Sequence, residues 1–210
     1  FKHVLHHEMV HLFINDMLYG GSVRNMMYSK VKPIPLWMNE GLAEYLATKW
    51  NTNSEMWVRD IAINSGELPT FYELGGYLAY RGGHSIWNFI CTKWGNEIIS
   101  EIFWELKKIG NLNKTFQNTL GIDLKGLIDM WHKNLKDLYW PEIKLRDNIG
   151  DIASTLIDHT KLNNSYNIAP SISPTGEKFA IYSNKSGNMG VYLVSSDGTF
   201  IKKIIAGEQT

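Results

Sequence analysis

Apolar residues recur at three- and four-residue spacing through most of the first 140 residues, which predicts a series of amphipathic helices. The first helix is expected from about Phe1 to Leu18, with Gly20 ending it. A second is expected after Pro35, and a third with Ser54 as its N-cap. The residues expected to pack inward from the first helix include Val4, Leu5, Leu12 and Ile14.

Further helical segments are predicted before residue 141. The segment from Tyr77 to Trp94 has a helical pattern despite the pair Gly82-Gly83, and residues 97–109 carry a clear apolar stripe. Another stripe begins after Asp123, and Pro141 is expected to end that helix. These patterns predict a mainly α-helical domain over residues 1–140.

The pattern changes from helical to alternating spacing at about residue 165. The sequence FAIYSN at residues 179–184 follows SPTG at residues 173–176, and SSDG at residues 195–198 is a tight hairpin signal. The alternation predicts antiparallel strands over residues 165–210. Residues 141–164 are then expected to form a linker.

The charge balance excludes some partners. The chain has 21 basic and 21 acidic residues without a basic stripe, so nucleic acid is not an expected partner. It has no run of eighteen apolar residues, so we expect no transmembrane segment in it. The single cysteine, Cys91, lies in an apolar helical stretch and is expected to be a small core residue.

The sequence HEMVH at residues 7–11 contains two histidines four residues apart. On a helix, His7 and His11 share one face and can direct two imidazoles at one ion. Glu8 lies beside them and need not coordinate. A catalytic zinc has three protein ligands and one open position, so a third ligand must come from another segment.

The segment WMNEGLAEY at residues 37–45 supplies the best candidate, Glu40. Glu44 follows one helical turn later on the same face. A carboxylate there is suited to accept the free N–H of a zinc-bound histidine, which fixes the tautomer of the ring. The sequence therefore predicts His7, His11 and Glu40 as zinc ligands and Glu44 as their supporting residue.

HExxH followed by NEGLAEY resembles the gluzincins, the thermolysin and aminopeptidase branch of the zincin metallopeptidases. The resemblance covers residues 1–140 and implies a mainly α zincin-like metallopeptidase domain, truncated at its N-terminus, with its upstream sheet largely missing. It further implies one Zn²⁺ per chain, Glu8 as the general base, and a peptide or protein substrate. The segment between His11 and Glu40 is longer than in thermolysin, and its residues 20–35 are expected to shape the cleft.

The sequence AYRGGHSIWNFI at residues 79–90 resembles the segment that follows the NEG motif in some bacterial gluzincin-like families. The resemblance implies that a tyrosine or histidine here stabilises the oxyanion of the reaction. Tyr80 is the first choice and His84 the second, with ordinary core packing as the alternative for both. Surface or packing roles, not metal binding, are expected for His3, His6 and His132.

SPTG, FAIYSN and SSDG together resemble a repeat of a TolB-type β-propeller. The resemblance implies that residues 165–210 are an all-β propeller-blade fragment, the first blade of a propeller truncated at its C-terminus, which can dock a protein partner. The alternative is a β-meander packed on the peptidase. The two resemblances together imply a bacterial protein of the periplasm or cell envelope.

Two other functions remain open at this point. One is a catalytically idle zincin scaffold whose propeller binds partners. The other is a non-catalytic helical module in which the histidines are packing residues. Zinc content separates the second from the rest, and activity separates the first. The sequence does not distinguish an endopeptidase from an exopeptidase.

Overall fold

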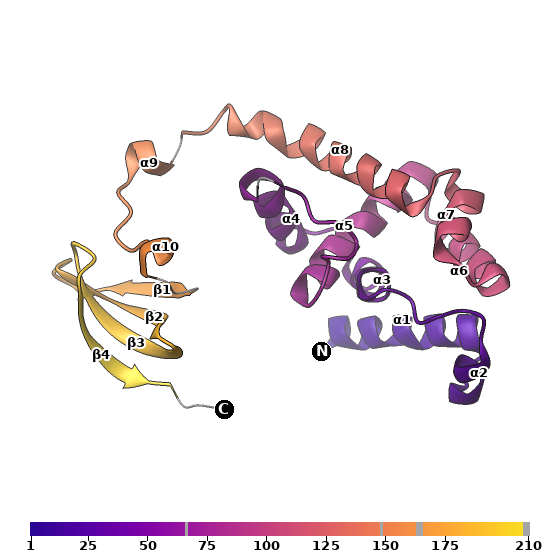
Figure 1. Ribbon diagram of the computed structural model, residues 1–210, viewed down its shortest axis with the longest axis horizontal. Coiled ribbons are helices and arrows are strands. Elements are labelled where there is room, and N and C mark those ends of the chain that lie inside the picture. The colour runs from indigo at the N-terminus through magenta and orange to yellow at the C-terminus, as the bar shows by residue number, and fades with distance from the viewer. Residues whose placement is uncertain (66, 148, 163–165, 208–210) are drawn as a thin grey trace. The chain divides into compact units, whose positions relative to one another are not determined.

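The computed structural model describes residues 1–65, 67–147, 149–162 and 166–207. The chain divides into two compact units, Phe1–Arg146 and Asp147–Thr210. The first is helical, and the second contains a four-stranded antiparallel sheet (Figure 1). The expected boundary between linker and strands, at residues 164 and 165, lies outside the described residues.

The helices of the first unit follow one another closely along the chain. Their bounds are α1 (Lys2–Tyr19), α2 (Val23–Tyr28), α3 (Leu36–Thr48), α4 (Thr52–Asn64), α5 (Tyr77–Trp94), α6 (Ile98–Ile109), α7 (Leu112–Leu120) and α8 (Leu124–Ile143). The pattern of apolar residues predicts α1, α3, α4, α5, α6 and α8. It misses the short helices α2 and α7. None of the helices in the described ranges has the combination of length and hydrophobicity needed to cross a membrane.

Two helix ends differ from the expectation. The N-cap of α4 is Asn51, whose side-chain oxygen accepts a hydrogen bond from the Ser54 backbone N–H at 3.1 Å. Ser54 itself lies inside the helix and is fully buried. The helix α8 continues past Pro141 to Ile143, because a proline in the last turn removes only one backbone hydrogen bond.

The packing face of α1 also differs from the prediction. Ile14 is buried as expected, but Val4, Leu5 and Leu12 are exposed. The face of α1 toward α3 follows the three- and four-residue spacing of His7, Val10, Ile14 and Leu18. The spacing that aligns the two motif histidines therefore also selects the buried residues, and the other apolar side chains of α1 fall outside it.

The helices α3 and α5 are packed backbone to backbone. A Cβ atom on Gly41 would lie 2.3 Å from the carbonyl carbon of Gly83, and one on Gly83 would lie 2.1 Å from the carbonyl oxygen of Trp37. The indole N–H of Trp87 also donates to the buried carbonyl of Met38 at 2.9 Å. Glycine is needed at both positions because only its missing side chain permits this approach. The contact fixes α5 beside the NEGLAEY helix.

The core of the helical unit surrounds this pair. In Figure 1, α3 and α5 lie between α1 and α8. The Trp131 indole on α8 donates to the Ser85 hydroxyl on α5 at 3.0 Å, and both groups are buried. The largest fully buried side chains are Trp37, Trp87, Trp131, Phe103, Phe116 and Met38. This aromatic core makes a rigid support for the residues of α3 and α5.

The second unit contains two short helices, α9 (Ile149–Ile152) and α10 (His159–Leu162), followed by an antiparallel sheet. The strands β1 (Asn167–Ile172), β2 (Lys178–Ser186), β3 (Asn188–Ser195) and β4 (Phe200–Ala206) pair in chain order. Gly198 has φ 87° in the predicted SSDG turn between β3 and β4.

The sheet buries little apolar surface within this unit. Its buried cluster consists of Ile181, Tyr192 and Val194. A larger set of apolar side chains on the strands remains exposed, namely Ile168, Ile172, Tyr182, Ile201, Ile204 and Ile205.

Candidate metal centre

The helices α1 and α3 bring the three predicted ligands together. The carboxylate atom Oε2 of Glu40 lies 3.1 Å from Nε2 of His7 and 3.3 Å from Nε2 of His11. The three ligand atoms lie within 4.8 Å of one another. His7 is buried, and His11 and Glu40 are half-buried.

These distances fit a tetrahedral zinc ion. Zinc binds imidazole nitrogen and carboxylate oxygen at about 2.0–2.2 Å, so neighbouring ligand atoms in a tetrahedron lie about 3.3 Å apart. Both separations from Glu40 are close to that value. Two imidazoles and one carboxylate also leave one position of the tetrahedron open, as catalytic zinc sites require.

The second ring nitrogen of His7 faces another carboxylate. Its Nδ1 lies 3.1 Å from Oε1 of Glu44, which is buried. A neutral imidazole has one N–H and one lone pair. In the tautomer that donates the Nδ1 proton to Glu44, the Nε2 lone pair faces Glu40, as a metal ion held between the two side chains would require. The structure thus brings Glu44 into contact with a predicted ligand.

His11 makes a similar contact, which the sequence analysis does not predict. Nδ1 of His11 lies 3.2 Å from the side-chain oxygen of Asn39. Asn39 immediately precedes Glu40, so its role is recognisable only once the crossing of α1 and α3 is known. With Glu44 on His7 and Asn39 on His11, both imidazoles have their Nδ1 atoms occupied and their Nε2 atoms facing Glu40.

Glu8 and Tyr80 border the cluster. Glu8 is exposed on α1, one residue after the predicted ligand His7. The Tyr80 ring stacks on the His7 ring, with centroids 5.9 Å apart and an interplanar angle of 15°. Burial raises the pKa of Tyr80, and the negative charges of Glu40, Glu44 and Glu8 raise it further. The phenol therefore keeps its proton and can donate a hydrogen bond.

His84 lies in a different environment. Its side chain is fully buried, and Nδ1 lies 3.0 Å from the Ser54 hydroxyl. Arg81 donates to that same hydroxyl at 3.2 Å, so the Ser54 proton is free to be donated to Nδ1 of His84. Burial lowers the pKa of His84 to about 4, which keeps the ring neutral near pH 7.

The remaining histidines named by the sequence analysis are outside the His7–His11–Glu40 cluster. His3 and His6 are exposed, although Nε2 of His3 lies 3.4 Å from Oε1 of Glu44. His132 on α8 makes a contact of 3.0 Å to the carbonyl oxygen of Pro69.

The segment between α1 and α3 forms a small hollow beside the cluster. The hollow has a volume of about 170 Å³, and His11 and Asn39 line it together with Met26, Pro33 and Ile34. Part of the 20–35 segment therefore lies next to a predicted ligand.

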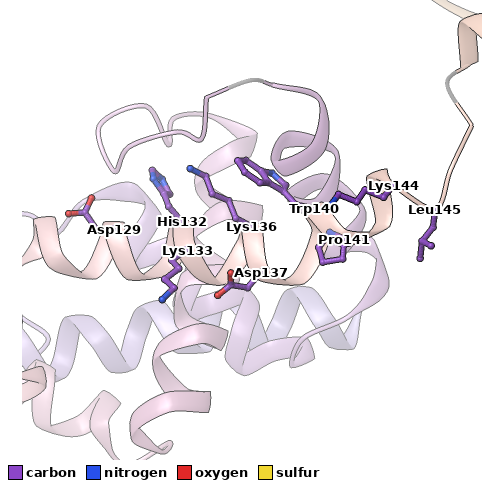
Figure 2. Close-up of a pocket in the computed structure, with 9 residues that line it drawn as sticks. All are labelled: Asp129, His132, Lys133, Lys136, Asp137, Trp140, Pro141, Lys144 and Leu145. Atoms are coloured by element: carbon purple, nitrogen blue, oxygen red, sulfur yellow. The ribbon is translucent and has the colours of Figure 1, made fainter.

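A wider hollow of about 1010 Å³ runs along α8 and shares no residue with the cluster. Figure 2 shows His132, Lys136 and Trp140 on one side of α8, with Lys133 and Asp137 pointing to the other. Its charged residues are exposed, with lysines and aspartates mixed. Among the described residues that line the hollow along α8, no charged side chain is buried.

Comparison of the chain with protein-family models, with curated proteins and with solved structures finds no match.

Proposed function

We propose that the chain is a zinc-dependent hydrolase that cleaves peptide bonds, with His7, His11 and Glu40 as the metal ligands. The observation that carries the proposal is the spacing of these three side chains, 3.1 and 3.3 Å between the histidine nitrogens and the shared carboxylate oxygen. It is supported by the residues that fix both imidazoles, Glu44 and Asn39.

The chemistry needs a base and an electrophilic metal. A zinc ion held by His7, His11 and Glu40 would supply the electrophile, because it would lower the pKa of a water molecule toward neutrality and polarise the substrate carbonyl group. Glu8 is the exposed carboxylate beside the ligands, and it takes the proton of the attacking water and passes it to the leaving amine.

Tyr80 is the better candidate for the residue that stabilises the oxyanion. Its ring lies against His7, and its raised pKa keeps the O–H available as a donor. His84 is fully buried and engaged with Ser54, so we assign it to the support of α4 and α5.

We further propose that the sheet of the second unit is one blade of a β-propeller. The meander of four strands and the exposed isoleucines of β1 and β4 support this, because a blade buries its faces against neighbouring blades. The resemblance to a TolB-type propeller also implies a protein partner and a location in the periplasm or cell envelope. Both stay proposals.

The test combines metal loading with a conservative change of the base. Zinc-loaded chain is assayed on a fluorogenic peptide library beside Glu8→Gln and Glu8→Asp variants. We expect Glu8→Gln to keep the zinc and lose about 10²–10⁴-fold in kcat, with partial recovery in Glu8→Asp. Equal turnover by Glu8→Gln would exclude Glu8 as the base. A zinc-loaded parent that cleaves no peptide would favour the idle scaffold.

A further inference from the structure

The crossing of α1 and α3 builds two overlapping His–His–Glu clusters, one turn apart. The first is His7, His11 and Glu40, and the second is His3, His7 and Glu44. In each, two histidines four residues apart on α1 face one glutamate of α3. By ligand type alone, either cluster is able to hold a zinc ion.

His7 belongs to both clusters through different ring nitrogens. Its Nε2 lies 3.1 Å from Glu40, and its Nδ1 lies 3.1 Å from Glu44. A neutral imidazole has a single lone pair, so His7 can be a ligand in only one cluster while its other nitrogen donates a proton. The two clusters are therefore alternatives, and some feature of the fold must choose between them.

The glutamates differ in their cationic partners. Arg81 donates from Nη1 to Oε2 of Glu44 at 2.8 Å, and both side chains are largely buried. In the described part of the chain, no lysine or arginine nitrogen lies within 4.0 Å of the Glu40 carboxylate, whose ion-pair partners are His7 and His11.

Arg81 is itself fixed in place by two neighbours. Its Nε donates to the Tyr77 hydroxyl at 2.8 Å, and its Nη1 also donates to Ser54 at 3.2 Å. These contacts connect α5 to α4, so the guanidinium reaches Glu44 from a rigid support. The position of its charge is set by the packing of three helices.

We propose that Arg81 is a positioning residue that selects the metal site. It forms an ion pair with Glu44 and repels a cation from the His3–His7–Glu44 cluster. Zinc is thereby directed to His7, His11 and Glu40. A divalent ion on Oε1 of Glu44 would share one buried carboxylate with the guanidinium, where water screens like charges weakly. With Arg81 present, Glu44 serves as the acceptor for the His7 N–H instead. This inference rests on the zinc site of the proposed function.

The test asks whether removal of the charge opens the second cluster. Zinc affinity is measured by competition with a chromophoric chelator, and folding is checked by circular dichroism. Glu40→Ala alone should bind zinc at least about tenfold more weakly than the parent. Adding Arg81→Gln should restore binding by about tenfold or more, and adding His3→Ala should abolish that gain. Arg81→Lys in the Glu40→Ala background keeps the charge and should restore nothing.

A second comparison leaves the Glu44–Arg81 pair intact. In the otherwise unchanged chain, His3→Ala should keep the zinc affinity within about twofold, while His11→Ala should lower it by about tenfold or more. The absorption spectrum of the Co²⁺-substituted chain should change only in His11→Ala. The reverse order would overturn the assignment of the site even if the Arg81→Gln variant does not fold.

The possible results distinguish a failure of the role of Arg81 from a failure of the zinc site itself. A parent that binds no zinc contradicts both. A parent whose zinc depends on Glu40 and His11, combined with no gain from Arg81→Gln, leaves the metal site standing and refutes the role of Arg81.

Discussion

The contact between Gly41 and Gly83 allows a strong test, because it holds α5, which carries Tyr80, against α3, which carries Glu40. In Gly83→Ala, the new Cβ would lie 2.1 Å from the carbonyl oxygen of Trp37 and 2.9 Å from Cα of Gly41. Ordinary contacts of a Cβ atom begin at 3.4 Å, so α5 must move from α3 by about 1 Å or more. Both clashing groups belong to the backbone, which cannot turn aside as a side chain does.

The cost follows from that displacement. Overpacking of this kind costs about 1–3 kcal/mol or more, and the helix propensity of alanine returns about 1 kcal/mol. The same shift moves Tyr80 away from the cluster, and a misplacement of about 1 Å costs about 10²-fold in rate. Both clashing groups are backbone, so the cost lies at the upper end of that range, and after the gain in helix propensity we expect Gly83→Ala to lose about 2 kcal/mol in urea unfolding and most of the proposed peptidase activity.

Gly82→Ala is the matched control, one residue away on the same helix. Its Cβ would meet the Cδ2 atom of Leu74 at 2.6 Å, and Leu74 can change rotamer. The gain in helix propensity offsets that adjustment, so Gly82→Ala should stay within about 1 kcal/mol of the parent. Equal stability and activity in the two variants would refute the argument that the backbone contact positions α5.

Three further predictions concern single side chains. Tyr80→Phe should lower kcat by about 10²–10³-fold with zinc affinity unchanged; full activity would remove Tyr80 from the mechanism. His84 binds a proton in the unfolded chain below pH 6.5 but in the fold only below about pH 4, so stability should decline by about 3 kcal/mol as the pH falls through that window. In His84→Gln, unfolding followed from pH 7 to pH 4 should lack this decline; parallel pH profiles would contradict it. Trp131→Phe should cost about 1–3 kcal/mol by leaving the buried Ser85 hydroxyl unpaired, and Ser85→Ala in that background should cost little more, whereas additive losses would refute their pairing.

The helical spacing of the sequence is enough to place the predicted ligands on one face of each helix. His7 and His11 share one face because four residues make about one helical turn, and Glu40 with Glu44 obeys the same rule on the second helix. These are local relations, and a single sequence contains them. The change to alternating residues likewise predicts β2, β3 and β4. It misses β1, because that strand lies in a stretch rich in proline and serine, which is typical of a turn.

The residues that support the cluster from outside it, Asn39 and Arg81, cannot be predicted from the sequence in the same way. Asn39 matters because α1 packs on α3, and Arg81 matters because α5 packs on α3 through the backbone contact of Gly41 with Gly83. In the sequence alone, the two glycines are typical of weak helix positions. Their role follows only from the neighbour that each one faces.

The sequence wrongly predicts Ser54 as the N-cap of α4, for a related reason. A serine before an acidic residue and an apolar run favours an N-cap, and Asn51 three residues earlier fits that role equally well. Tertiary contacts decide between them, because Ser54 faces Arg81 and His84 in the interior.

The central claim is that His7, His11 and Glu40 bind one zinc ion, and metal analysis of the purified chain tests it most directly. The parent should contain one zinc per chain, and His7→Ala and Glu40→Ala should each lose it or bind it at least about tenfold more weakly while remaining folded. A folded parent that takes up no zinc, or variants that keep the parent's zinc affinity, would contradict the account.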